Sequence, residues 1–208
     1  MNFDRLAPFY QTMERLAAGR KLRLCREAFL GEIPEPRAVL LAGEGRGGFL
    51  CECLKRFPNA RFTVVDSSRV MLDLARKRVE DADLKRVLFV HADLSEWSGD
   101  ERFDCIATHF FLDCFSPQTL AAIVAKLAAL ATDDAVWLLS DFQVANKRFS
   151  AIRSRWILWL LYRFFRVFCK LEARSLTAAD PFLSEAGFRL EKRREFDWGL
   201  LKSECWRR

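Results

Sequence analysis

The chain has 208 residues, which at about 150 residues per domain indicates one domain rather than two. With 51% hydrophobic residues, 30% charged residues and 9 Gly, the composition is globular and excludes collagen-like, disordered and disulfide-stapled classes. The net charge of +6 is uneven, because residues 1–145 carry 19 basic and 21 acidic side chains, whereas residues 146–208 carry 15 and 7. No secretory signal opens the chain and its 7 Cys are an odd number, so we expect reduced thiols and a cytoplasmic location.

The first two thirds of the chain alternate between apolar runs and helical patterns. An amphipathic N-terminal helical segment precedes them. Such alternation predicts a parallel sheet covered by helices on both faces. The expected strands are 38–42, 61–65, 87–91, 103–108 and 135–140, and the expected helices are 50–57, 67–79 with a serine cap, and 119–131 with a Ser-Pro start.

The ending breaks this alternation. A long aromatic helix is expected over 148–171 and a short one over 177–186, followed by strands 188–196 and 200–206. The turn between these strands has only three residues, so the strands must be antiparallel. We therefore expect one domain over 1–208, composed of an N-terminal helical cap (1–30), a core (37–145), an aromatic helical insertion or lid (146–175) and a closing helix with a strand pair (177–208).

A glycine-rich turn follows the first strand, with the sequence Gly43-Glu44-Gly45-Arg46-Gly47-Gly48. Glycines let the backbone turn tightly and approach a ligand, and the following helix start offers free N–H groups to an anion. The spacing fits both GxGxxG of dinucleotide sites and the looser GxGxG of methyl-donor enzymes. The turn therefore indicates a nucleotide-like ligand without deciding between these two classes.

Two aspartates extend this pattern at the ends of the next strands. Asp66 ends the second strand, 21 residues after Gly45, close to the spacing at which an acid accepts the ribose hydroxyls of an adenine nucleoside. Asp93 ends the third strand at the same edge, where it could bind the adenine amino group. The carboxyl edge of an open parallel sheet is where ligands bind, so we expect the site there.

These segments together resemble a known family. VLLAGEGRGGFL, FTVVDSS, FVHADLSEW and FDCIATHFFLDCF are similar to the corresponding motifs of class I methyltransferases that use S-adenosylmethionine, especially small ones acting on quinones and other small molecules. The resemblance covers essentially the whole chain. It implies a Rossmann-like, doubly wound α/β fold with a seven-stranded, mostly parallel sheet, an antiparallel last strand and helices on both faces.

The resemblance also implies S-adenosylmethionine as cofactor. One position departs from the family pattern, because Leu41 stands where the family usually has an acid, and Glu44 is expected to contact the donor's ammonium group instead. The residues that the resemblance assigns to cofactor binding are Gly43, Glu44, Gly45, Gly47, Asp66, Ser67, Asp93, Leu94 and Thr108.

Candidates for the reaction centre follow the fourth strand. His109 has an ordinary pKa near 6.5, which suits a base at neutral pH, and Asp113 could orient it or act itself. Tyr10 and Asp141 are weaker candidates for contact with the acceptor. No metal is expected, because CxxC and HExxH patterns are absent from the sequence.

The expected helix over 148–171 leaves several functions open. Its apolar run is too short to cross a bilayer, so no transmembrane span is expected. It could pack on the domain or on a second subunit, cover an apolar acceptor, or lie on a membrane surface, whereas nucleic acid is less favoured. We expect a methyltransferase acting on O, N or C of a hydrophobic small molecule. The alternatives are a non-catalytic methyltransferase-like binding protein and an NAD(P)-dependent oxidoreductase.

Overall fold

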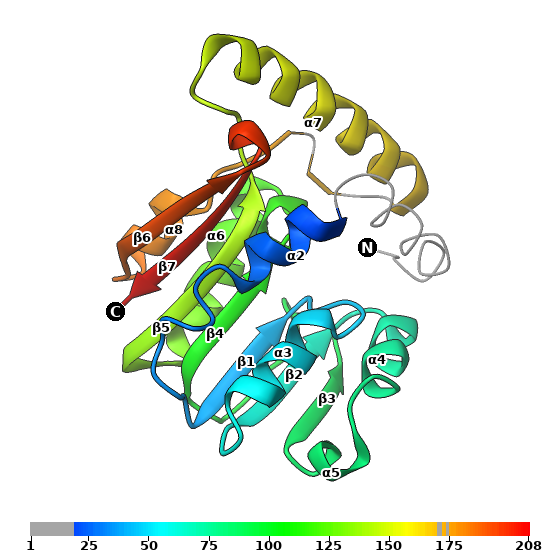
Figure 1. The fold of residues 1–208 in the computed structure, drawn as a ribbon, viewed down its shortest axis with the longest axis vertical. Coiled ribbons are helices and arrows are strands. Elements are labelled where there is room, and N and C mark those ends of the chain that lie inside the picture. The colour runs from blue at the N-terminus through cyan, green and yellow to red at the C-terminus, as the bar shows by residue number, and fades with distance from the viewer. Residues whose placement is uncertain (1–18, 170–171, 174) are drawn as a thin grey trace.

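One sheet of seven strands forms the centre of the molecule (Figure 1), seen here in a computed structural model that describes residues 19–169, 172–173 and 175–208. The strand order is β3-β2-β1-β4-β5-β7-β6, and β7 alone runs antiparallel to its neighbours. The fold class expected from the sequence is therefore confirmed. The strands are β1 (Ala38–Ala42), β2 (Arg61–Asp66), β3 (Val87–His91), β4 (Phe103–His109), β5 (Ala131–Phe142), β6 (Arg189–Phe196) and β7 (Leu201–Arg207).

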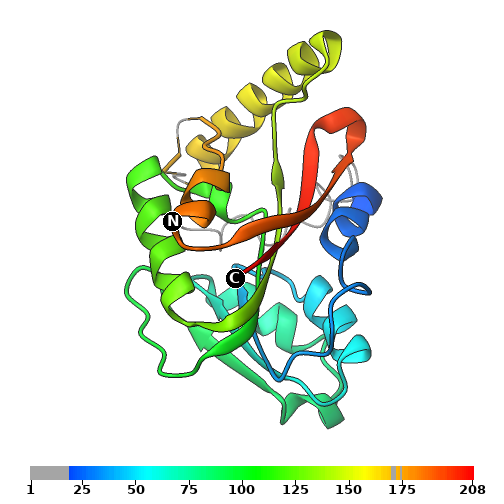
Figure 2. The same cartoon turned by 90° about the vertical axis from the view of Figure 1, so that its left-hand side faces the viewer.

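Helices lie on both faces of this sheet (Figure 2). The helical elements are α2 (Gly19–Glu27), α3 (Gly48–Arg56), α4 (Arg69–Arg76), α5 (Asp81–Leu84), η1 (Leu112–Cys114), α6 (Pro117–Ala129), α7 (Arg148–Cys169), α8 (Asp180–Glu185) and η2 (Asp197–Gly199). Two predicted caps are present, since Ser68 accepts from the Met71 N–H and Ser116 accepts from the Thr119 N–H. Such caps satisfy N–H groups that the first helical turn leaves unpaired.

Two apolar layers hold the helices to the sheet. On one face, α3 buries Phe49, Leu50 and Leu54 against β1 and β2. On the other face, α6 buries Leu120 and Leu127, among others, against the same sheet. Each such side chain stabilises the fold by about 1.5–3 kcal/mol, which fixes the positions of the loops at the strand ends.

Several boundaries differ from the sequence prediction. β5 begins at Ala131 rather than at residue 135, because Ala131 pairs with Phe103 before the main register of β4 and β5 is established. Helix α8 begins at Asp180 rather than at residue 177, and α5 and η1 were not predicted. All of these are short or terminal pieces, where tertiary contacts outweigh local propensity.

Helix α7 belongs to neither layer, and it crosses the end of the sheet towards which the parallel strands point (Figure 1). It packs through Leu158 and Tyr162, which join a small core with Cys25, Leu200 and Leu201. Its contact with the body of the molecule, to which Ile157 and Phe165 also contribute, is confined to one side of the helix.

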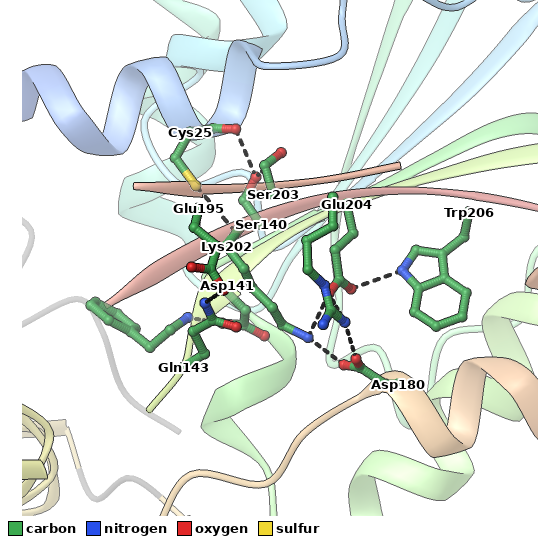
Figure 3. A network of polar contacts seen from close by, with 12 residues as sticks. Cys25, Ser140, Asp141, Gln143, Asp180, Glu195, Lys202, Ser203, Glu204 and Trp206 are labelled. Atoms are coloured by element: carbon green, nitrogen blue, oxygen red, sulfur yellow. Dashed lines mark hydrogen bonds and ion pairs between the residues drawn. The ribbon is translucent and has the colours of Figure 1, made fainter. Parts of the chain in front are cut away.

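A buried polar network anchors β7 to its surroundings (Figure 3). The Cys25 thiol of α2 donates to the Lys202 carbonyl of β7 at 3.2 Å. On β7 the Lys202 ammonium pairs with Glu204 at 2.9 Å and also with Asp180 of α8. Because a buried charge is tolerated only when it is paired, these contacts fix the last strand relative to α2 and α8.

Candidate functional site

The glycine turn between β1 and α3 has a backbone shape that side chains would disturb. Gly43 and Gly47 have φ of 68° and 77°, which lie in the left-handed region. A Cβ atom on Gly43 would lie 2.2 Å from the Phe111 ring, and one on Gly47 would lie 2.9 Å from the Ala75 Cα. The turn therefore requires glycine at these two positions for both conformation and space.

Asp66 at the end of β2 is hydrogen-bonded to this turn. Its carboxylate accepts from the Gly45 N–H at 3.1 Å and from the Ser68 N–H at 2.9 Å. The glycine turn and Asp66, which their positions after successive strands predict at one edge, thus lie in direct contact. An ionised carboxylate has about four acceptor positions, so these two bonds do not exhaust the capacity of Asp66 to accept hydrogen bonds from the hydroxyl groups of a ligand.

Glu44 extends from the same turn towards the start of α3. Its Oε1 accepts from the Phe49 N–H at 2.9 Å and from the Leu50 N–H at 3.1 Å. Burial raises the pKa of Glu44 to about 7, although these hydrogen bonds and the charge of Arg26 act in the opposite direction. The carboxyl is therefore poised to lose a proton near neutral pH.

Arg26 of α2 lines the same pocket, although no sequence motif marks it. Its guanidinium lies 5.3 Å from the centre of the Phe110 ring, and its charge lowers the pKa of both Glu44 and His109. Helix α2 also carries three other basic residues. Nothing in the spacing distinguishes Arg26 from them, so only the packing of α2 could reveal its position.

His109 ends β4 and lies at the inner wall of the pocket. It is 6% exposed, its ring meets Phe49 edge-on at 4.4 Å, and neither ring nitrogen has a hydrogen-bond partner within the described residues. Burial, assisted by the charge of Arg26, lowers the pKa of His109 to about 3. The expectation of an ordinary pKa is therefore wrong, and His109 is a neutral imidazole with hydrogen-bonding capacity towards a ligand.

Aromatic side chains close the pocket on the side of β4. Phe110 has a positive φ of 54°, and Phe111 lies over Gly43 and against Phe115 at 5.0 Å. The cavity that remains measures about 120 Å³, below the several hundred typical of ligand sites. Binding of a nucleoside therefore requires Phe111 or its neighbours to move.

The structure separates the predicted site residues into two groups. Thr108 is buried and accepts from the Trp137 indole at 2.9 Å, away from the pocket, and Gly47 packs against Ala75. Leu41 is buried in the core beneath α3, so it makes no contact with the pocket. Tyr10 lies outside the described residues. Seven of the nine predicted cofactor residues line the cavity, namely Gly43, Glu44, Gly45, Asp66, Ser67, Asp93 and Leu94.

Asp113 and Asp141 form a buried pair behind the pocket wall. Burial raises the pKa of Asp113 to about 6, and burial together with the charge of Asp113 raises the pKa of Asp141. The Tyr162 hydroxyl of α7 donates to the Asp113 carbonyl at 3.0 Å. Neither aspartate lines the cavity. Through the bond to Tyr162, Asp113 instead connects the residues behind the pocket wall to α7.

Asp93 is exposed at the outer rim of the cavity. Its Oδ1 accepts from the Ser95 N–H at 2.9 Å and from the Ser95 hydroxyl at 2.7 Å, and these bonds lower the pKa of Asp93. Leu94 beside it is buried and offers an apolar surface to the cavity. The rim thus combines an ionised acid with an apolar floor, which suits a heterocyclic base.

Comparisons with known proteins identify methyltransferases similar to this chain. Residues 39–134 match the family model described as a methyltransferase domain. The malonyl-[acyl-carrier protein] O-methyltransferase of Halalkalibacterium halodurans is 35% identical over 148 residues, which are 68% of this chain and 53% of that protein. The chain thus spans about half the length of this curated relative.

Solved structures share the fold at lower identity. An O-methyltransferase family protein from Burkholderia thailandensis has a TM-score of 0.73 at 18% identity, covering 96% of this chain and 58% of that one. The 1,6-didemethyltoxoflavin-N1-methyltransferase of the same species has a TM-score of 0.62 at 22% identity, covering 97% and 86%. These likenesses show that the overall fold, over nearly the whole chain, also occurs in such proteins.

Proposed function

Because the chain belongs to the class I S-adenosylmethionine-dependent methyltransferases, we propose that it transfers a methyl group from this donor to a hydrophobic small molecule. The acceptor atom is O, N or C of a phenol, a quinone or a lipid precursor. The observation that carries the proposal is the contact between Asp66 and the Gly45 N–H at the carboxyl edge of β1 and β2. It supports a nucleoside site at the switch point between β1 and β4, where the strand order reverses.

The residues present fit the donor part by part. Asp66 and Ser67 would hold the ribose, and Asp93 with Leu94 the adenine. Glu44 would accept from the ammonium group, in place of the acid that Leu41 replaces, and Arg26 would pair with the carboxylate at the same end. When bound, the donor supplies a methyl group on a positively charged sulfur. The acceptor atom would attack the methyl carbon in line with the sulfur, which leaves as a neutral thioether, so much of the catalysis can come from positioning.

The acceptor would lie on the side of the aromatic residues. Phe110, Phe111 and Phe115 give this wall an apolar surface that favours a hydrophobic molecule. His109 would contact the acceptor and accept a hydrogen bond from its hydroxyl or amine. With its pKa lowered to about 3 in the free chain, His109 orients the acceptor more effectively than it removes a proton.

The names of similar proteins leave the acceptor atom open. The curated relative is named an O-methyltransferase, and one structural neighbour is named an N1-methyltransferase. A non-catalytic binding protein remains the second candidate, because Leu41 is buried in the core where the family usually presents an acid. Donor binding without turnover on a panel of phenols, quinols and amines would identify that case.

Calorimetric titration of the full chain with S-adenosylmethionine and S-adenosylhomocysteine tests the proposal. We expect saturable binding, weakened about 10- to 100-fold by Asp66→Ala, since hydrogen bonds to charged groups contribute about 1.5–3 kcal/mol. The matched control is Asp73→Asn on the exposed face of α4, which should leave binding unchanged. No heat of binding at millimolar donor would defeat the assignment.

A kinetic test separates His109 from the donor site. His109→Gln should lower kcat and leave donor affinity within about twofold, because the side chain lies on the acceptor side of the cavity. Equal losses in donor affinity and in kcat would place His109 in the donor site instead.

A further inference from the structure

Helix α7 exposes an apolar face to solvent, on the side opposite its packing against the body. Its inner face carries Ser154, Leu158 and Tyr162, all buried. Its outer face carries large apolar side chains, among which Phe149 is 87% exposed and Trp156 is 63% exposed. Further exposed members of the outer face are Ile152, Trp159, Leu160 and Val167. At 100° per residue, all six fall on one side of the helix.

This concentration is unusual for a single helix. Twelve large hydrophobic residues are exposed in the described part of the chain, and six of them lie on α7. A helix usually turns its apolar stripe towards the core and its charges towards water. An exposed apolar patch of this kind marks a surface that contacts something else.

A second segment extends the apolar face. Trp198 in the turn between β6 and β7 is 78% exposed and has a φ of 60°, a conformation that is unusual for a bulky residue. Asp197 beside it pairs with Arg153 of α7 at 3.0 Å, and Arg153 lies 5.9 Å from the Trp198 ring. The indole is thus held outward next to the first half of α7.

The charges of α7 identify the partner. The helix carries five arginines and no acidic residue. Arg148, Arg155 and Arg166 follow one border of the apolar face, and Arg163 lies within it, 5.5 Å from the Trp159 ring. A second copy of the chain would bring two such helices together with no acid on either to pair with the arginines.

An anionic lipid surface meets both requirements. It offers phosphate and carboxylate groups to arginine, and an apolar layer just beneath them to Trp, Phe and Leu. Among the helices that the structure describes, none combines the length and apolar character needed to cross a bilayer. We propose that α7, together with Trp198, docks the protein on an anionic membrane surface with the helix lying in the plane of the headgroups.

Docking goes beyond the proposed function and does not depend on it, because none of the α7 residues whose side chains the structure describes lines the donor cavity. The inner face of α7 nevertheless reaches the pocket wall through Tyr162 and the Asp113 carbonyl. A docked helix would therefore hold the acceptor side of the site near the lipid, where hydrophobic acceptors dissolve.

Co-sedimentation of the full chain with vesicles tests the proposal. We expect binding to vesicles of phosphatidylcholine with phosphatidylserine at low salt, and much weaker binding to phosphatidylcholine alone or at high salt. The double variant Trp156→Ser/Trp159→Ser, whose side chains are exposed, should bind at least about tenfold more weakly. The matched control is Leu88→Ser, since Leu88 on β3 is 59% exposed but far from α7 in the fold.

The contribution of the arginines and the oligomeric state of the chain can be measured separately. Arg155→Gln/Arg166→Gln should also weaken vesicle binding by at least about tenfold, whereas Arg69→Gln on α4 should not. Sedimentation equilibrium of the wild type should show a monomer. A dimer that dissociates in the double tryptophan variant would assign the face to a second copy and overturn the proposal, as would absence of vesicle binding at low salt. Donor titrations on the same variants keep this result separate from the proposed function.

Discussion

The proposed donor site at the carboxyl edge of β1 and β2, the donor edge, differs in kind of structure from the outer face of α7. At the donor edge, Gly45, Asp66 and Glu44 act through short contacts with backbone N–H groups. On α7, large side chains such as Trp156 extend into solvent and make few contacts with the body. Ligand binding at the edge should therefore depend on a backbone conformation that a single added Cβ atom would disturb. Binding by the outer face of α7 should depend instead on which side chains it exposes.

The largest expected effect concerns the backbone of the glycine turn. Gly47→Ala places a Cβ 2.9 Å from the Ala75 backbone at a φ of 77°, so we expect a loss of about 3 kcal/mol in the free energy of unfolding. Gly45→Ala has the same kind of φ but open space, and should cost about 1 kcal/mol. Gly31→Ala has neither problem and serves as the control. Urea unfolding measures all three, and equal losses at positions 47 and 31 would contradict the account.

A smaller effect concerns the acid pair that lies between the two regions. The folded pKa of Asp113 is about 6, above the ordinary 3.8, so its contribution to stability is present below about pH 4 and is lost as pH rises through 6. Asp113→Asn removes this loss. Between pH 5 and pH 8 the wild type should therefore lose about 1.4 kcal/mol more of its unfolding free energy than the variant, since only the interval from pH 5 to about 6 lies below the folded pKa.

Denaturant titrations at the two pH values measure this difference, with Asp73→Asn as an exposed control that should follow the wild type. His109 has the opposite effect on stability, because its lowered pKa makes the fold less stable as pH falls below 6.5. Since the wild type and the variant both contain His109, its effect cancels in the difference between them. A variant with the same pH dependence as the wild type would show that the pair is ionised in the fold.

Glu44 gives a smaller effect on binding. If its carboxylate accepts from the donor's ammonium group, a pKa of about 7 means that donor affinity should fall about tenfold between pH 8 and pH 6. Glu44→Gln should bind more weakly at pH 8 and show little of this dependence. Calorimetry at pH 6 in buffers of different ionisation enthalpy should detect proton release in the wild type only, and equal release in both would exclude Glu44.

The smallest expected effect is on the donor affinity of variants in α7. Trp156→Ser/Trp159→Ser should change donor affinity by less than about twofold, because neither tryptophan lines the cavity. A loss of donor affinity comparable to that of Asp66→Ala would mean that the two regions are one site.

The sequence predicted the donor edge better than it predicted α7, and the reason is physical. Gly43, Asp66 and Asp93 follow strands whose carboxyl ends must meet, so spacing alone places them at one edge. Arg26 comes from a helix whose packing has no local signal. His109 follows the predicted fourth strand and lines the cavity, but its pKa depends on burial that only the packed structure shows.

For α7 the sequence indicated a wide apolar face, but it did not indicate which part of this face packs on the protein and which part is exposed to solvent. That direction depends on how Leu158 and Tyr162 pack against β7 and α2, which are 40 or more residues distant in sequence from the helix centre. Thr108 illustrates the same limit, since successive residues of a strand point to opposite faces and its side chain meets Trp137 instead of the cavity.

A crystal structure of the full chain with S-adenosylhomocysteine tests the central claim most directly. We predict the ribose hydroxyls on Asp66, the amino-acid end beside Glu44 and Arg26, and the Phe111 ring displaced from Gly43. A nucleoside bound elsewhere, or a complex in which the Phe111 ring still covers Gly43 and Asp66 contacts only Gly45 and Ser68, would contradict the account.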